Sequence, residues 1–169
     1  YIHVMILGGI NIILAIGMNI ITGYCGQINL GMAGFYAVGA YTSAILCARL
    51  GLSFWIALPI AAAVSAAAGF VVGVPALKVR GGVYLVLVTT SFAGIVKVIL
   101  NQWVGLTNGP MGIVGIPAPQ IGALALYERV HWFYLVYAFV VVLTVLSNHL
   151  VNSRIGRSLV AVRESEVSA

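Results

Sequence analysis

Five long apolar stretches take up most of this 169-residue chain. A helix needs about 20 apolar residues to cross the hydrocarbon core of a bilayer, because it rises only about 1.5 Å per residue. We expect spans at residues 2–22, 32–48, 54–77, 83–102 and 132–150, with a connection containing Gly and Pro, residues 104–131, before the last. The predicted fold class is therefore an all-α, polytopic transmembrane bundle over residues 1–152, followed by a polar tail, residues 153–169.

The composition supports this class and argues against an enzyme. Hydrophobic residues make up 62% of the chain and charged residues 7%, against about a quarter charged in soluble domains. Asp is absent and the only acidic residues are Glu128, Glu164 and Glu166, so no carboxylate pair is available for acid/base chemistry. The cysteines and histidines have no ligand spacing, and no Gly-x-x-x-x-Gly-Lys-Ser/Thr loop is present to hold ATP phosphates. We expect no cofactor and no metal.

The cations predict the orientation of the spans. With the five spans placed as above, one side of the membrane holds five cations, Lys78, Arg80, Arg154, Arg157 and Arg163. The other side holds Arg49 and Arg129. Because cytoplasmic loops are enriched in Lys and Arg, the first side is predicted to be cytoplasmic, and all three Trp residues then lie at outer ends of spans. Topology explains the net charge of +5 without a nucleic-acid partner.

Neither end of the chain resembles the end of a protein. Residue 1 is Tyr1 without a polar flank, and Val167-Ser168-Ala169 stops inside an expected helix without a C-cap signal. We expect the chain to be part of a longer protein.

Small residues recur every fourth position in the third span. They are Ala57, Ala61, Ser65, Gly69 and Gly73. Such a stripe lets a neighbouring helix approach closely, and we favour this packing role over the alternative that the stripe lines a pore.

Polar residues interrupt the apolar sequence between the first two spans, at residues 23–31. Broken helices at membrane depth expose backbone groups to a polar solute, so Gln27 and Asn29 are candidates for a translocation path. An ordinary short cytoplasmic loop is an equally good interpretation.

The fourth span places Thr89, Ala93, Lys97 and Asn101 on one helical face. We take Thr89 and Lys97 as further candidates for the path. A buried ammonium is costly unless it is paired or reaches the interface. Lys97 is close to the predicted outer end, so snorkelling to the interface is favoured over contact with a solute.

Several motifs together resemble bacterial branched-chain amino-acid ABC transporter permeases, in particular the M-type subunit. They are Gly-Tyr-Cys-Gly-Gln-Ile-Asn-Leu-Gly (23–31), Gly-Ala-Tyr (39–41), Pro-Ala-Leu-Lys-Val-Arg-Gly (75–81), Leu-Thr-Asn-Gly-Pro-Met-Gly (106–112), Gly-Ile-Pro (115–117) and Ser-Arg-Ile-Gly-Arg (153–157). The resemblance covers nearly the whole chain. This sequence departs from the family pattern at Gly94, where a Glu is common, and at Met32, where a His is common.

The resemblance implies a permease of the bacterial inner membrane that works with a second permease subunit, two cytosolic ATPases and a periplasmic binding protein to import leucine, isoleucine or valine. Related permeases for urea, amides or other amino acids are the first alternative. A channel or ion-coupled carrier that needs no ATPase is the second, and the scarcity of ionisable groups in the spans disfavours it.

The polar tail is weakly amphipathic. The resemblance makes it the start of a helix that docks on an ATPase, with candidate contacts Arg154, Ile155, Arg157, Leu159, Val162 and Arg163. The residues alone allow a second interpretation, in which the basic residues after the last span fix its topology and have no partner.

Overall fold

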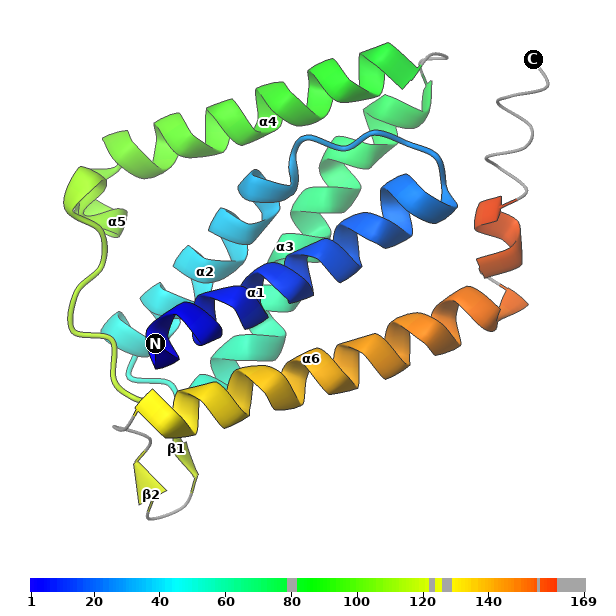
Figure 1. Ribbon diagram of the computed structural model, residues 1–169. Coiled ribbons are helices and arrows are strands. Elements are labelled where there is room, and N and C mark those ends of the chain that lie inside the picture. The colour runs from blue at the N-terminus through cyan, green and yellow to red at the C-terminus, as the bar shows by residue number, and fades with distance from the viewer. Residues whose placement is uncertain (79–81, 122–123, 126–128, 155, 161–169) are drawn as a thin grey trace. The chain divides into compact units, whose positions relative to one another are not determined.

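The computed structural model describes residues 1–78, 82–121, 124–125, 129–154 and 156–160 (Figure 1). A helix occupies each of the five predicted spans, and the predicted all-α class is confirmed. The long helices are α1 (Ile2–Met18), α2 (Met32–Arg49), α3 (Phe54–Lys78), α4 (Gly82–Gln102) and α6 (Arg129–Asn152).

Four helical stretches among the described residues are long and apolar enough to cross a membrane: Ile2–Tyr24, Phe54–Val74, Tyr84–Gln102 and Arg129–Asn152. The helix α2, which covers the second predicted span, is not one of them. It carries Tyr36, Tyr41, Thr42 and Ser43 among its apolar residues. Because α2 contacts both α3 and α4, much of its surface lies against protein, where lipid-compatible side chains are not needed.

The chain divides into two compact units, one formed by residues 1–29 and 126–169 and the other by residues 30–125. In the first unit α1 runs along α6 (Figure 1). Gly9 of α1 is buried, and a Cβ added there would come within 2.6 Å of Cγ1 of Val136 on α6. The missing side chain therefore lets the two helices pack closely.

The helix α1 continues directly into a π-helix, η1 (Asn19–Tyr24). The sequence predicted a helix through residue 22 and gave no sign of the wider winding. Within this turn the Thr22 hydroxyl is buried without a hydrogen-bond partner in the part of the chain that the structure describes. π-Helical turns inside α-helices are rare and are found mostly at functional sites.

In the second unit α3 lies against α2, and the small-residue stripe can be followed along this contact. Ala57 and Ala61 are buried. The Ser65 hydroxyl donates a hydrogen bond to the carbonyl oxygen of Phe35 on α2 over 2.9 Å. A Cβ on Gly69 would lie 3.7 Å from the Phe35 ring, whereas one on Gly73 would meet nothing within 4 Å.

The connection between α4 and α6 has more structure than its Gly and Pro content predicted. It holds a short helix α5 (Val104–Thr107), a 3-10 turn η2 (Gly109–Met111) and an antiparallel strand pair, β1 (Gln120–Ile121) with β2 (Leu124–Ala125). Gln120 pairs with Ala125 and Ile121 with Leu124. Two-residue strands are too short to leave a periodic signal in the sequence.

Candidate functional site

The segment between η1 and α2, residues 25–31, buries polar side chains and exposes apolar ones. The polar residues turn inward, since Gln27 is half-buried and Asn29 is only 9% exposed. The apolar residues turn outward, with Ile28 54% and Leu30 52% exposed. A loop in water shows the opposite pattern, because exposed apolar surface is unfavourable there. This pattern suits a segment that is surrounded by lipid or by another protein.

Thr89 anchors the end of this segment to α4. The backbone N–H of Leu30 donates to the Thr89 hydroxyl oxygen over 3.3 Å. The same hydroxyl donates back to the carbonyl of Leu85, 2.9 Å away. Its hydroxyl therefore bonds to the backbone of both elements. Thr89 is 3% exposed, so protein surrounds it.

The first turn of α2 then crosses α4 at Gly34. A Cβ added to Gly34 would lie 3.0 Å from Cα of Ala93 and 3.0 Å from the ring of Phe92. Next to this crossing the rings of Phe35 and Phe92 contact one another at a tilt of 31°, with their centroids 4.7 Å apart. The glycine therefore sets how near the two helices lie.

At and beside the crossing, α2 and α4 line an open groove of about 560 Å³, here called the α2–α4 groove. Its walls are mostly small and apolar: Ala33, Gly34, Ala37, Ala93 and Gly94. Its polar side chains are Tyr41, Thr90, Lys97 and Asn101. A mostly apolar hollow with a few convergent polar groups is the usual form of a small-molecule site.

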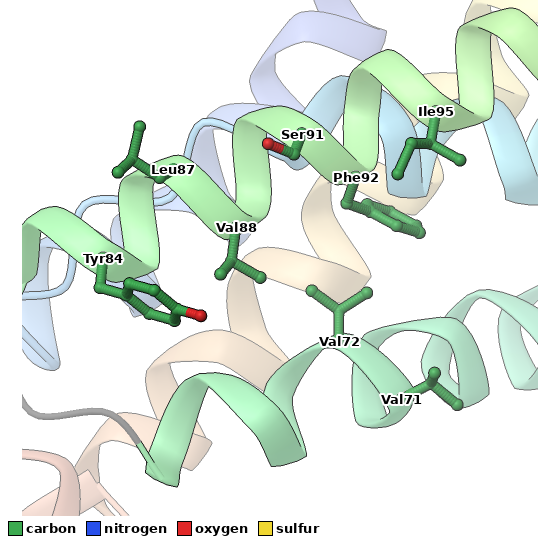
Figure 2. Close-up of a pocket in the computed structure, with 8 residues that line it drawn as sticks. All are labelled: Val71, Val72, Tyr84, Leu87, Val88, Ser91, Phe92 and Ile95. Carbon is green, nitrogen blue, oxygen red and sulfur yellow. The ribbon is translucent and has the colours of Figure 1, made fainter.

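A second groove, of about 490 Å³, lies between α3 and α4 (Figure 2). It is lined mainly by aliphatic and aromatic side chains, and Figure 2 shows Val72 and Val88 pointing toward one another across it. Val88 and Lys97 are separated by about two and a half helical turns, which puts them on opposite faces of α4. The face of α4 toward α3 is therefore mainly apolar, apart from Tyr84 and Ser91, and the opposite face carries Lys97.

The predicted path residues do not all meet. Lys97 lines the α2–α4 groove together with Ala93 and Asn101, as the shared face predicted, while Thr90 takes the place expected for Thr89. Gln27 and Asn29 belong to the other compact unit. Their part in a path stays a prediction.

The loop that follows α4 caps the end of this helix through Thr107, which the sequence did not single out. Its side chain is 2% exposed, and its hydroxyl lies 2.6 Å from the Leu100 carbonyl oxygen and 2.9 Å from that of Trp103. The N–H of Gly109 donates to the same hydroxyl. Gly109 has φ +58°, and a Cβ there would lie 3.0 Å from the Asn101 carbonyl oxygen. Glycine is the residue that fits this conformation and this spacing.

The tail begins with a turn after α6 that hydrogen bonds of Ser153 hold in place. The Ser153 hydroxyl donates to the Leu150 carbonyl over 2.6 Å and accepts the N–H of Gly156 over 3.4 Å. A Cβ on Gly156 would overlap the Val151 carbonyl. The chain is helical again at residue 154 and at residues 156–160.

Within this helical stretch Arg154 and Arg157 are exposed and Leu159 is half-buried. The other predicted docking residues, Ile155, Val162 and Arg163, lie outside the described residues.

Comparison with known proteins shows which family the chain is similar to. A family described as the permease component of the branched-chain amino acid transport system matches residues 1–169. The high-affinity branched-chain amino acid transport system permease protein LivM of Salmonella typhimurium is 40% identical over 94% of this chain. LivM of Escherichia coli is 39% identical over the same share. The chain spans 43% of the length of each of these relatives, and no solved structure matches it.

Proposed function

The chain belongs to the family of permease components of branched-chain amino acid transport systems, and we propose that it is part of the LivM-like subunit through which such a system moves its amino acid. It is a multi-pass membrane protein and its family members are transport subunits. The single observation that carries the proposal is the family match over the whole chain. Leucine, isoleucine and valine are the proposed substrates, and the bacterial inner membrane is the proposed location.

The proposed partners are a second permease subunit, two cytosolic ATPases and a periplasmic binding protein. The family match supports separate partner subunits, because the matched family is the permease component of a larger transport system. The exposed Arg154 and Arg157 at the start of the tail support a docking role for this region, since both guanidinium groups are available to a partner. Ile155, Leu159, Val162 and Arg163 complete the proposed docking surface.

We propose two sets of path residues, each taken by itself: the polar residues of the segment 25–31, and Thr89 and Lys97 on α4. The inward Gln27 and Asn29, with outward apolar neighbours, favour membrane depth over a loop in cytosol. Thr89 supports the path by holding the segment in place, and Lys97 by lining the α2–α4 groove. The stripe from Ala57 to Gly73 is proposed as contact surface for α2.

Uptake into vesicles tests the proposal. The full-length protein is reconstituted with its neighbouring permease and ATPase subunits, and leucine uptake is measured with the loaded binding protein outside and ATP inside. We expect uptake that requires ATP and is competed by isoleucine and valine. Urea and short amides serve as alternative solutes, and transport of these without transport of leucine would contradict the proposed substrate. Leucine uptake that persists without ATPase subunits would contradict the ABC mechanism.

A further inference from the structure

The hydroxyl of Thr22 in η1 differs from the other threonine hydroxyls of the chain. Five threonines donate a hydrogen bond to the carbonyl oxygen four residues before them, over 2.7–2.9 Å: Thr42, Thr89, Thr90, Thr107 and Thr144. The Thr22 oxygen is buried and has no partner in the part of the chain that the structure describes. In an α-helix its acceptor would be the carbonyl of Met18, the residue before η1. The π winding therefore removes the bond that the other threonines make.

The backbone hydrogen bonds at the end of η1 are long. The N–H of Cys25 donates to the carbonyl of Ile20, five residues back, over 3.4 Å. The N–H of Gln27 donates to the carbonyl of Ile21, six residues back, also over 3.4 Å. Most N–H···O bonds in proteins measure about 2.7–3.2 Å. Long bonds and a buried hydroxyl without a partner both lower the stability of the π winding relative to the α winding.

A change of winding in η1 would turn the segment that follows it. A π turn bonds five residues back instead of four, so it holds one more residue than an α turn. A return to α winding therefore turns the chain after η1 by about 100°, the rotation of one helical residue. Gln27 and Asn29, which now face inward, would be carried to another side. Gly26 follows the turn directly with φ +71°, a conformation in which glycine gives the backbone unusual freedom.

Gly23 favours the π winding. A Cβ added to Gly23 would lie 2.5 Å from Oδ1 of Asn19, so a larger residue must displace this amide from the turn. In an α-helix, by contrast, alanine is the most favourable residue and glycine one of the least favourable. The two positions therefore act in opposite directions, since the Thr22 hydroxyl favours α winding and Gly23 favours π winding.

We propose that η1 is a hinge that converts between π and α winding and thereby reorients Gln27 and Asn29. In the π state the Asn19 amide lies over Gly23 and the Thr22 hydroxyl is unpaired. In the α state this hydroxyl donates to the Met18 carbonyl. Such a hinge acts independently of which solute the protein carries.

A distance measured across η1 tests the hinge. Spin labels are attached to Leu7→Cys on α1 and to Ile28→Cys after the turn, which are both exposed and both belong to the unit that contains residues 1–29. The other cysteines, Cys25 and Cys47 included, are replaced by alanine. The full-length protein is placed in nanodiscs with its partner subunits, and pulsed electron paramagnetic resonance records the distances. We expect two populations, one for each winding.

Variants of the turn should move these populations in opposite directions. Thr22→Val keeps the shape of the side chain without the hydroxyl and should lower the ratio of α to π winding about tenfold, the factor expected for one buried hydroxyl that loses its partner. Gly23→Ala should raise this ratio. Thr22→Ser keeps the hydroxyl and should stay near the parent protein. Thr144→Val removes a hydroxyl from α6 and is the matched control, with no change expected.

Three results would overturn the hinge: a single distance that neither Thr22→Val nor Gly23→Ala changes, a shift in the same direction by both variants, or an equal shift by Thr144→Val. A shift in the same direction would mean that both substitutions only loosen the turn. Gly23→Ala gives an answer even if Thr22→Val fails to assemble, because a hinge requires this variant to enrich the population that is minor in the parent protein.

Discussion

At Gly34 one hydrogen atom in place of a side chain decides how near α2 lies to α4. The neighbouring atoms belong to the Ala93 backbone and the Phe92 ring, and backbone cannot move aside as a flexible side chain can. The sequence showed a glycine in a helix but could not show what lies opposite it. Lys97 differs in this respect, because its cost in an apolar span was visible from its chemistry alone.

Gly34→Ala should destabilise the protein by about 1–3 kcal/mol, because the new methyl group forces α2 and α4 apart. Thermal unfolding of the purified full-length protein in detergent measures the change. Gly39→Ala on the same helix is the control, since its Cβ would lie at an ordinary 3.9 Å from Ser65, and it should stay within about 1 kcal/mol of wild type. Equal stability of the two variants would contradict the tight crossing.

Thr107→Val should also destabilise, by about 1–3 kcal/mol, because it leaves the N–H of Gly109 without its acceptor inside the protein. The exposed Thr144→Val is the comparison. Its hydroxyl bonds only to the Val140 carbonyl of its own helix, so the change should be within about 0.5 kcal/mol. Unfolding in detergent measures both, and a Thr107→Val protein as stable as Thr144→Val would show that the cap contributes nothing.

Among the elements, the long helices were predictable and the irregular ones were not. Apolar stretches of about 20 residues predict helices such as α3 and α6 whatever their neighbours in the fold are. The π-helix η1 and the strand pair β1–β2 depend on contacts that hold a few residues in one geometry, and no short pattern encodes them. The sequence left open whether Gln27 and Asn29 face a path or lie in a cytoplasmic loop, since the residue order alone allows either face to be buried.

The helical stretch after Ser153 is an element whose role can be tested separately from its fold. Arg157→Glu combined with Leu159→Asp reverses a charge and adds one on the proposed docking surface, so the ATPases should no longer copurify with the permease. Arg157→Lys with Leu159→Ile should keep the complex whole. Membrane insertion should be unchanged in both variants, because Arg157 and Leu159 lie beyond the end of α6 at Asn152. A complex that purifies intact with the charge-reversed pair would refute the docking role.

For the whole molecule, the uneven distribution of cations predicts sidedness, a property that neither compact unit defines by itself. The tail side holds Arg154 and Arg157, and the loop that follows α4 holds no cation between Trp103 and Ile121. Positive-inside orientation then places the tail in the cytosol and this loop outside. Met111 in the loop is 85% exposed, and Ser158 in the tail is exposed as well, so each offers a site for labelling.

Met111→Cys should therefore react with a membrane-impermeant maleimide added to intact spheroplasts, whereas Ser158→Cys should react only after the membrane is opened. Both positions are exposed, so a difference in labelling reports the side of the membrane and not burial. Leu159→Cys, half-buried on the same helical stretch, should follow Ser158→Cys in sidedness while reacting more slowly. Labelling of Ser158→Cys in intact spheroplasts would invert the topology and, with it, remove the proposed ATPase contact from the cytosol.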